Sequence, residues 1–528
     1  MKVLPYGEDG AYLDLGVDDA PDRAARTLAA SAALRAAFPG ADVVCGAGVV
    51  AVFGANVDHV RAAMAVAEVA AGTAEVTGAA PGDRAAHVYT STANMRTHEI
   101  DVLYDGPDLD DVAARTGLDR ARIIDLHAGR EHTVEVVGFL PGFAYMGPID
   151  PRLVLPRRAS PRPRVDPQSV AIAGAFTGIY PLASPGGWHL LGRSLGPRPF
   201  DPARPSPFLF APGDRVRFRP AEIGRSPGAD AEVYASAHPA YTSDPTDRAA
   251  PALVVTRPPG LATVQDAGRP GLLGRGMPPA GPLDPVLFSA ANRAVDNPAG
   301  AAAVELLAGT VELRARGAVV LSVDGAPART LRDGDDLRVT TSERAVRYIA
   351  IAGGVDVPVV IGARATLLGA ALGGTGGRPL RRGDVLRAGA LRTGAARADL
   401  DARTPLAPTM EPEPAHLTID PGPHLDRFPP GALDVLVTTE WRLSRLTDRT
   451  GARLESGKVP RSGPDLAAPA PMCRGAVQVT TDGTPIVLGP DHPTTGGYPV
   501  LAVVRAESFG ALAQKRPGDV VRLRLATT

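Results

Sequence analysis

The order of apolar and polar residues divides the chain into short strands and a few helices. Near the N-terminus, apolar runs at Ala11–Leu15 and Val43–Phe53 predict strands. Two alanine-rich amphipathic segments, Asp22–Phe38 and Asp58–Ala71, predict helices. We therefore expect residues 1–85 to form a small α/β domain.

The pattern changes after His98. There the segment EIDVLYDG predicts a strand, and Pro107–Thr116 and Asp119–Ala128 predict two short helices. From Glu131 onward, short apolar runs alternate with proline and glycine turns, which is typical of a closed or nearly closed β-barrel. We expect this barrel to occupy residues 86–225.

A second cycle of strands follows a predicted linker at residues 226–251. It contains one predicted helix, Asp284–Val295, and a Pro/Ala/Arg-rich linker at 391–414 divides it into subdomains 252–390 and 415–528. The predicted fold class is α+β, mainly β: a small α/β N-terminal domain followed by β-barrel domains.

Internal repeats support related barrels in the two halves. The motif Gly-Asp-x-(Val/Leu)-Arg occurs at Gly213–Arg217, Gly334–Arg338, Gly383–Arg387 and Gly518–Arg522. Each copy is typical of a turn that leads into a strand. In addition, SPGGW at Ser184–Trp188 resembles TTGGY at Thr494–Tyr498. These repeats predict similar barrels and paired sites.

Composition limits the function classes. The 528 residues include 56 basic and 57 acidic side chains, so no electrostatic footprint for nucleic acid or an acidic membrane is present. Cys45 and Cys473 are too few for a disulfide framework. No apolar run reaches membrane-span length, and the start MKVLPYGEDG lacks a signal-peptide pattern. We expect a cytoplasmic protein that acts on small molecules or proteins.

Several common catalytic motifs are excluded by their context. Prolines surround the GxSxG patterns at Gly192–Gly196 and Gly224–Gly228, where a nucleophile elbow needs a helix. The segment Gly451–Lys458 has the wrong spacing for a phosphate-binding loop. The histidines show neither HxxxH nor HxH spacing, so no metal site is predicted.

The segment Val137–Arg193 is the densest in glycine, proline, aromatic and arginine residues, and we predict that it forms an active surface. Its arginine loop could clamp a carboxylate or phosphate, although a solvated basic loop is the alternative. The candidate residues are Arg162 for catalysis, with Phe143, Tyr145, Arg158, Arg164 and Tyr180 for binding.

Two histidines are catalytic candidates. His127 ends a predicted helix and could be a general base, or it could bind the last carbonyls of that helix. His189 follows Gly-Gly-Trp, where glycines allow close approach of a ligand, but it could also be an exposed strand residue.

The second half offers a glycine-bounded loop with Gln265, Asp266 and Arg269, the last two as catalytic candidates. Further candidate binding residues are Asp284, Asn292, Glu305, Arg449, Thr495 and Tyr498. We predict a composite site in which the arginine loop of the first barrel faces the Gln265–Arg269 loop.

Longer motifs carry a family resemblance. GFLPGFAYMG, TGIYPLASPGGWHLLGR and PGDRVRF resemble the allophanate hydrolase subunit 1 family, also called Kip-type inhibitor or the B subunit of 5-oxoprolinase. From about residue 252, GLATVQDAGRPG, YIAIAGGVDVP and TTGGYP resemble the allophanate hydrolase subunit 2 family, also called the C subunit of 5-oxoprolinase. The chain therefore resembles a fusion of two subunits, and the resemblance implies cyclophilin-like barrels.

The resemblance also implies an activity. It is the opening of 5-oxoproline, or a related small amide, to glutamate with ATP and Mg²⁺, in an oligomeric assembly with a separate LamB/YcsF-type A subunit. Arginines and backbone donors would stabilise developing charge, while carboxylates or His127 would move protons. Many relatives have other residues at Phe176, His189 and Pro493.

Two alternatives stay open. One is the carboxyltransferase component of a biotin-dependent, urea carboxylase-like system. The only lysines are Lys2, Lys458 and Lys515, and a Met-Lys-Met signature is missing, so no covalently bound biotin is expected. The other is a non-enzymatic inhibitor of a histidine kinase, as the Kip name implies.

Overall fold

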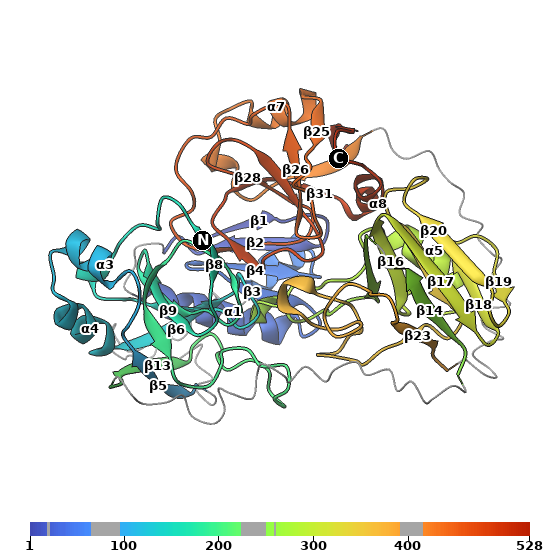
Figure 1. Cartoon of the computed structure of the whole chain (residues 1–528). Helices are drawn as coiled ribbons and strands as arrows, with labels where there is room; N and C mark the ends of the chain where they lie inside the picture. Colours follow the sequence, from blue (N-terminus) through green and yellow to red (C-terminus); the bar gives the residue numbers. More distant parts are fainter. Residues whose placement is uncertain (18–21, 65–94, 223–249, 258–259, 391–415, 528) are drawn as a thin grey trace.

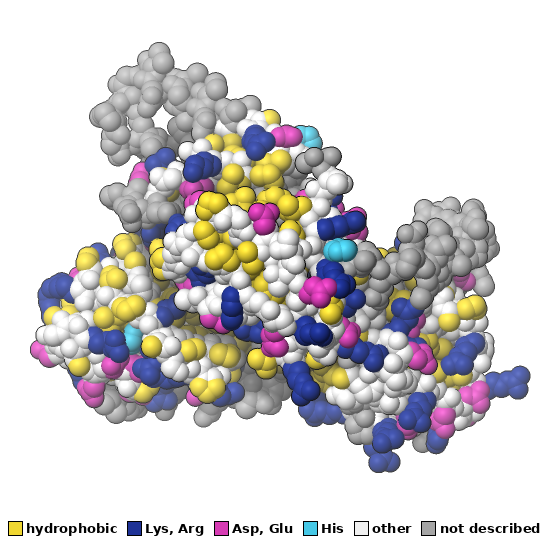
Figure 2. Space-filling model, turned by 90° about the horizontal axis from the view of Figure 1, so that it is seen from above, with side chains coloured by type: hydrophobic (Ala, Val, Ile, Leu, Met, Phe, Trp, Pro, Cys, Tyr) yellow, Lys and Arg dark blue, Asp and Glu magenta, His cyan; other side chains and the backbone are white. Residues whose placement is uncertain are grey.

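Strands dominate the computed structural model, which describes residues 1–17, 22–64, 95–222, 250–257, 260–390 and 416–527 (Figure 1). The predicted linker at 391–414 lies outside the described residues, as does most of the linker at 226–251. Figure 2 shows basic and acidic side chains interspersed on the face seen from above, in keeping with the balanced composition.

The described part of the N-terminal domain is a four-stranded sheet with two helical segments. Its strands, in sheet order, are β1 (Lys2–Pro5), β2 (Gly10–Asp14), β4 (Val49–Phe53) and β3 (Asp42–Cys45). The predicted helix is confirmed as α1 (Arg23–Ala37). The predicted single strand Val43–Phe53 is wrong, because a turn with Gly48 at φ +81° makes it the hairpin β3–β4. Residues 57–64 are helical, and the rest of Asp58–Ala71 lies outside the described residues.

Both faces of this sheet are buried, and alternate residues face opposite ways. Ala11 and Leu13 of β2 pack in one core with Leu34 of α1. Tyr12, between them, packs in another core with Met472 from the C-terminal domain. The apolar pattern of β2 and β4 thus fits a sheet covered on both sides.

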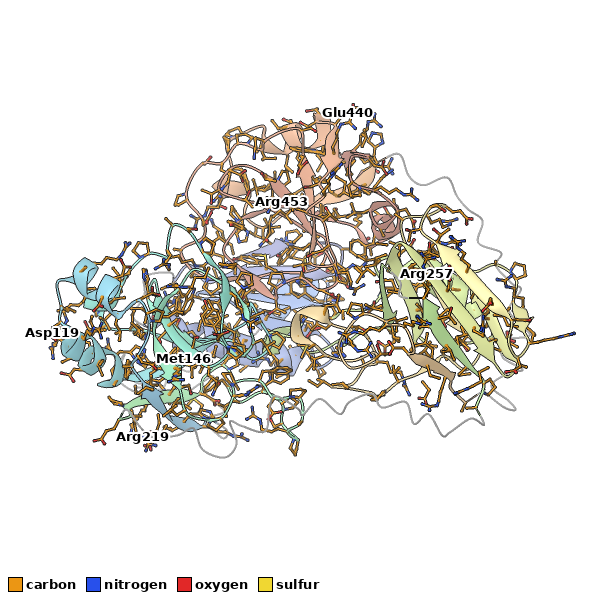
Figure 3. The ribbon with its side chains drawn as sticks, in the orientation of Figure 1. Asp119, Met146, Arg219, Arg257, Glu440 and Arg453 are labelled. Carbon is orange, nitrogen blue, oxygen red and sulfur yellow. The ribbon has the colours of Figure 1, made fainter. Side chains whose placement is uncertain are left out.

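The first barrel is closed, as predicted. In order around the barrel its strands are β10 (Phe176–Ile179), β7 (Ala144–Gly147), β6 (Glu131–Val137), β13 (Arg215–Pro220), β5 (Thr97–Leu103), β12 (His189–Ser194) and β9 (Ser169–Ala173). The predicted helices α3 (Leu109–Thr116) and α4 (Arg120–Ala128) are confirmed. Figure 3 places Met146 among the barrel strands and Asp119, the N-cap of α4, at the outer end.

The C-terminal domain repeats this strand order. Its eight strands are β33 (Leu523–Leu525), β24 (Leu417–Pro421), β31 (Val500–Val504), β28 (Ala476–Val479), β29 (Pro485–Leu488), β26 (Gly451–Glu455), β25 (Trp441–Leu443) and β32 (Val520–Val521). In both domains the last strand runs parallel to the first, β13 beside β5 and β33 beside β24. The two helices of this domain are α7 (Ala432–Thr438) and α8 (Phe509–Ala513). The predicted relation between the halves is therefore visible in their topology.

The similar segments SPGGW and TTGGY also adopt similar structures. The first forms β11 (Ser184–Gly186), which pairs with β8 (Arg162–Val165). The second forms β30 (Thr495–Gly496), which pairs with β27 (Ala470–Pro471). Each barrel therefore carries a small two-stranded flap.

The middle domain contains two five-stranded sheets around one apolar core. One has the order β20 (Asp336–Thr340), β17 (Thr310–Arg316), β14 (Ala252–Arg257), β23 (Val385–Ala388) and β22 (Val355–Asp356). The other has the order β15 (Leu261–Gln265), β16 (Ala303–Ala308), β21 (Arg347–Ile351), β18 (Val319–Val323) and β19 (Arg329–Leu331). The predicted helix is α5 (Pro285–Arg293). Its assignment as a cyclophilin-like subdomain stays a prediction.

The four Gly-Asp motifs form one recurring turn. Gly213, Gly334, Gly383 and Gly518 all have φ between +83° and +96°, a region that favours glycine. In each copy the aspartate side chain accepts a hydrogen bond from the backbone N–H three residues before it. A strand follows each turn, so this prediction is confirmed.

The two halves of the chain are joined through backbone and side-chain contacts. The Asp42 carboxylate accepts hydrogen bonds from the N–H groups of Gly271 and Leu273. The Tyr6 hydroxyl donates to the carbonyl of Pro471 over 3.0 Å. None of the helices that the structure describes is long and apolar enough to cross a membrane.

His424 fixes a buried part of this junction. The backbone N–H of Val500 donates to its Nδ1, so Nε2 carries the hydrogen and donates to the Tyr12 hydroxyl, both over 3.0 Å. Burial lowers the pKa of His424 from 6.5 to about 4. The folded state therefore holds the neutral ring.

We expect this histidine to make the junction sensitive to acid. As pH falls below about 6.5, the unfolded chain takes up the proton first, so the free energy of unfolding should decrease until about pH 4. His424→Gln should flatten this slope by up to about 1.4 kcal/mol per pH unit. Denaturant titrations across this range would measure it, with exposed His59→Gln as the control. An unchanged slope in His424→Gln would contradict the assignment.

Candidate functional site

A small cavity opens at the mouth of the first barrel, with a volume of about 180 Å³. It is lined by Phe139, Phe143, Tyr145, Arg157, Pro161, Tyr180, Pro185, Gly186, Gly187 and Trp188. The residues come from the turn before β7 and from β7 itself, from the arginine loop, from the end of β10 and from the SPGGW flap. The predicted binding residues Phe143, Tyr145 and Tyr180 are thus brought together, and we call this the aromatic cavity.

The aromatic wall is fixed by edge-to-face packing. The ring of Phe143 is fully buried and lies 5.0 Å from Tyr145, 5.4 Å from Tyr180 and 5.3 Å from Trp188, all measured between ring centroids. Such T-shaped pairs contribute about 0.5–1.5 kcal/mol each beyond area burial. Phe139 has φ +67°, an uncommon value for a bulky side chain that marks a strained turn beside the cavity.

Arg157 is the arginine that reaches the cavity. The other candidates in its loop are occupied by carboxylates: Arg158 and Arg162 both bond to buried Asp108. Arg164 pairs with Asp166 in solvent. Within the described part of the chain, no carboxylate pairs with Arg157. The predicted anion site therefore centres on Arg157, whereas Arg158 and Arg162 hold the loop in place.

The second half of the chain lies beside the aromatic cavity. A Cβ placed on Gly138 would lie 2.2 Å from Oγ1 of Thr495, so the GFLPG turn and the TTGGY flap are in direct contact. A Cβ on Gly497 would lie 3.8 Å from Nη1 of Arg157. The hydroxyl of Thr495 is buried beside the hydroxyl of Tyr145. The arginine loop thus faces Thr495–Gly497 rather than the predicted Gln265–Arg269, and a composite site stays a prediction.

The phenols of the cavity stay protonated at neutral pH. Burial raises the pKa of Tyr145, and the charge of Arg157 and the neighbouring Thr495 hydroxyl only partly oppose this shift. Burial also raises the pKa of Tyr180. Both hydroxyls are therefore available as hydrogen-bond donors. Tyr498, the last predicted residue of the flap, is 36% exposed and does not line the cavity.

The two candidate histidines lie away from this cavity. His127 is buried in the barrel, with Nδ1 2.7 Å from the Tyr104 hydroxyl and Nε2 2.7 Å from the Thr177 hydroxyl. Burial lowers its pKa well below the ordinary value. His189 donates from Nε2 to the carbonyl of Pro156 over 3.0 Å, with its ring buried. Their contacts favour positioning roles over proton transfer to a substrate.

The side chains of the Gln265–Arg269 loop form hydrogen bonds with neighbouring backbone segments. Arg269 is buried and donates to the carbonyls of Val360 and Ala365. Asp266 accepts from the N–H groups of residues 268, 364 and 365. Gln265 donates to the carbonyl of residue 366. These contacts match a turn held by its own side chains, so the loop braces the segment 360–366.

Three further candidates do converge, at the boundary between the middle and C-terminal domains. The guanidinium of Arg449 bonds to Glu305 and, in two-point geometry at 2.9 Å, to Asp491. Tyr348 donates to Glu305 over 2.7 Å, and its hydroxyl accepts from the N–H of Asp284. The nearby carboxylates raise the pKa of Arg449 despite its burial. This network fixes two domains to each other.

Asn292 belongs to a separate structural contact. Its amide donates to the carbonyl of Ala301 over 2.8 Å and accepts from Asn297 over 3.0 Å. The side chain therefore closes the turn after α5.

Arg157 lines the cavity but was not among the arginines selected from its predicted loop. The adjacent aromatic motif was the signal that could have favoured Arg157 over its neighbours. Nothing in the sequence indicated that Asp108 binds the neighbouring arginines. No group of three or more His, Cys, Asp or Glu side chains among the described residues is arranged to hold a metal ion.

Comparisons with known proteins divide the chain into the same two halves. Residues 1–210 match the family described as carboxyltransferase domain, subdomain C and D. Residues 275–525 match the family described as carboxyltransferase domain, subdomain A and B. The first match contains the residues that line the aromatic cavity, and the second contains the flap that lies beside it.

Individual relatives divide the chain in the same way. A region of 129 residues is 49% identical to the B subunit of 5-oxoprolinase from Escherichia coli O157:H7, covering 24% of this chain and 59% of that relative. A region of 277 residues is 32% identical to the C subunit of 5-oxoprolinase from Escherichia coli K12, covering 50% of this chain and 87% of that relative. The match to the B subunit thus spans less than two thirds of that relative.

A solved structure covers nearly the whole chain. The crystal structure of TTHA0988 superposes with a TM-score of 0.78 at 32% identity, covering 98% of this chain and 99% of that one. The arrangement of both halves in one polypeptide is therefore shared with an experimental structure. By these matches, the chain belongs to the carboxyltransferase-domain family that includes the B and C subunits of 5-oxoprolinase, as a fusion in which the B-like half precedes the C-like half.

Proposed function

We propose that this chain is the fused B and C component of an ATP-dependent 5-oxoprolinase, which converts 5-oxoproline to glutamate together with a separate LamB/YcsF-type A subunit. One observation carries the proposal: Thr495 of the C-like half packs against Gly138 and reaches the Tyr145 hydroxyl, beside the aromatic cavity of the B-like half. A single site then needs both halves, which gives a physical reason for their fusion.

The cavity suits a small cyclic amide with a carboxylate. Its volume of about 180 Å³ lies below the ~300–1,000 Å³ typical of sites for drug-sized ligands. Arg157 would bind the carboxylate, and the buried rings of Phe143 and Trp188 would pack against the five-membered ring. The hydroxyls of Tyr145 and Thr495 would hydrogen-bond to the lactam group and polarise its carbonyl before ring opening.

The same cavity does not fit a nucleotide, because a triphosphate and an adenine need more space and more cations than one arginine supplies. The segment around Gly451, which resembles a phosphate-binding loop in sequence, is strand β26. We therefore assign the use of ATP and Mg²⁺ to the assembled complex and derive no step through them. The residues of this chain would bind, orient and shield the amide.

Reconstitution tests the proposal directly. The purified chain is mixed with its A subunit, ATP, Mg²⁺ and 5-oxoproline, and glutamate is measured over time. We expect glutamate only when all components are present. Formation of glutamate without this chain, or none in the complete mixture, would exclude the proposed activity.

Removal of the cavity arginine should weaken substrate binding. Arg157→Ala deletes a charged hydrogen-bond donor, a loss of about 1.5–3 kcal/mol, so the KM for 5-oxoproline should rise about 10- to 100-fold. Arg164→Ala is the matched control, because this arginine lies in the same loop and pairs with Asp166 in solvent. Equal kinetics of the two variants would remove Arg157 from the site.

The contact between the halves should be essential for activity. Gly138→Ala places a Cβ against Thr495 at 2.2 Å, which the branched threonine cannot accommodate without moving the flap. We expect kcat/KM to fall more than about tenfold while circular dichroism stays unchanged. Gly463→Ala is the control, because its Cβ would have no neighbour within 4 Å and Gly463 does not line the cavity. Full activity of Gly138→Ala would show that the contact with Thr495 is dispensable.

Carboxyl transfer is a second candidate, favoured by the carboxyltransferase description of both matching families. It predicts bicarbonate-dependent transfer from a separate biotinylated protein. The same preparation, assayed with such a carrier and labelled bicarbonate in the absence of the A subunit, separates the two reactions. Label transfer without glutamate formation would favour this second function.

A further inference from the structure

A second and larger cavity, of about 720 Å³, lies between the middle and C-terminal domains. One wall is formed by the end of β16, the GPLD turn and the short helix η7 (Leu368–Ala370). The opposite wall is formed by β26, the turn after β29 and helix α8. We call it the interdomain cavity. Its volume falls within the ~300–1,000 Å³ of small-molecule sites.

Hydrogen bonds between the two domains fix the positions of these walls relative to each other. Arg474 donates from Nη2 to the carbonyl of Leu283 over 2.7 Å. Gln514, after α8, donates to the carbonyl of Val346 over 3.2 Å. Arg516 donates to the carbonyl of Thr341 over 2.6 Å. The space is therefore framed by hydrogen bonds across the domain boundary.

The walls are mainly aliphatic. The side chains that define them are Leu283, Leu307, Leu368, Leu443, Phe509 and Leu512. Of these, Leu307, Leu368 and Leu512 are only half-buried, so apolar surface remains accessible inside the cavity. A ligand that covers this surface would gain about 25 cal/mol per Å² of apolar area removed from water.

The charged end of the cavity is organised around Arg449 and Arg474. Arg449 is already saturated by Glu305, Asp491 and the carbonyl of Gly281. The guanidinium of Arg474 lies 4.2 Å from the ring centroid of Phe509. Among the described residues, no carboxylate forms an ion pair with Arg474. The planar face of the Arg474 guanidinium therefore packs on Phe509, while its positive charge can pair with the anion of a ligand.

We propose that the interdomain cavity binds an amphipathic monoanion, a carboxylate with an aliphatic chain, whose carboxylate pairs with Arg474 and whose chain lies along the leucine walls. This goes beyond the proposed oxoprolinase function and does not depend on it. Burial lowers the pKa of Arg474 to about 10, so the arginine stays charged at neutral pH and gains from an anionic partner.

The charge of the cavity favours a monoanion over a polyphosphate. Its ionisable lining consists of Asp448, Arg449, Arg474, Asp491, Lys515 and Arg516. Together with Glu305, which bonds to Arg449, these groups leave one net positive charge. A nucleoside triphosphate would bring several negative charges into a space with mainly apolar walls, where unpaired charge is costly.

Calorimetric titration of the full chain with decanoate tests the proposal, with decanol as the uncharged counterpart. We expect saturable binding of one decanoate per chain and at least about tenfold weaker binding of decanol, because the ion pair contributes about 1.5–3 kcal/mol. Equal binding of both compounds, or no saturable binding of decanoate, would overturn the proposal. Competition by a non-hydrolysable ATP analogue would also overturn it, since the site would then belong to nucleotides.

Substitutions locate the binding within the chain. Arg474→Gln should weaken decanoate binding about 10- to 100-fold. Leu368→Asp, on half-buried η7, should weaken it as well by repelling the carboxylate and wetting the wall. This second variant keeps the test valid if Arg474→Gln fails to fold.

Arg453→Ala is the matched control (Figure 3). Arg453 follows Ala452 on β26 and lines a different cavity, while Ala452 lines the interdomain cavity, so the two side chains face opposite sides of one strand. We expect unchanged affinity in this variant. Equal affinity in Arg453→Ala and in both cavity variants would place the binding elsewhere and refute the assignment.

Discussion

The burial of both faces of the N-terminal sheet is the constraint on which the other contacts depend. Strands β2 and β4 direct alternate residues into two separate cores, one under α1 and one shared with the C-terminal domain. A sheet with two apolar faces gains its burial free energy only when both are covered. Because α1 covers one face, the second face requires the far end of the chain, and Figure 1 shows that domain lying over the sheet.

This docking determines the geometry of the site. It brings the TTGGY flap of the C-terminal barrel against the GFLPG turn of the first barrel, where only glycine fits at residue 138. The Asp42 carboxylate adds a second anchor by binding the backbone of residues 271 and 273. The aromatic cavity is lined by the first half of the fusion, and domain packing places the flap of the second half beside it.

Arginine serves two physical purposes in this chain, and its partners distinguish them. Arg158, Arg162 and Arg449 are saturated by carboxylates, and these buried or half-buried pairs position loops and domains. Arg157 and Arg474 line cavities and lack such pairs among the described residues. Since an unpaired guanidinium near apolar surface attracts an anion, these two arginines mark the places where ligands can bind.

The sequence by itself determined the local elements, the closed first barrel, the Gly-Asp turns and the kinship of the two halves, because apolar periodicity and turn residues act over short distances. It also singled out Phe143, Tyr145 and Tyr180, which the structure brings together in one cavity. Only the tertiary structure decided which arginine serves that site, because the competing partner Asp108 lies about fifty residues away in sequence. The same holds for His127, whose ring is enclosed by Tyr104 and Thr177. Partners that are distant in sequence decide whether a polar side chain makes structural contacts or stays available to a ligand. No local sequence pattern specifies these partners.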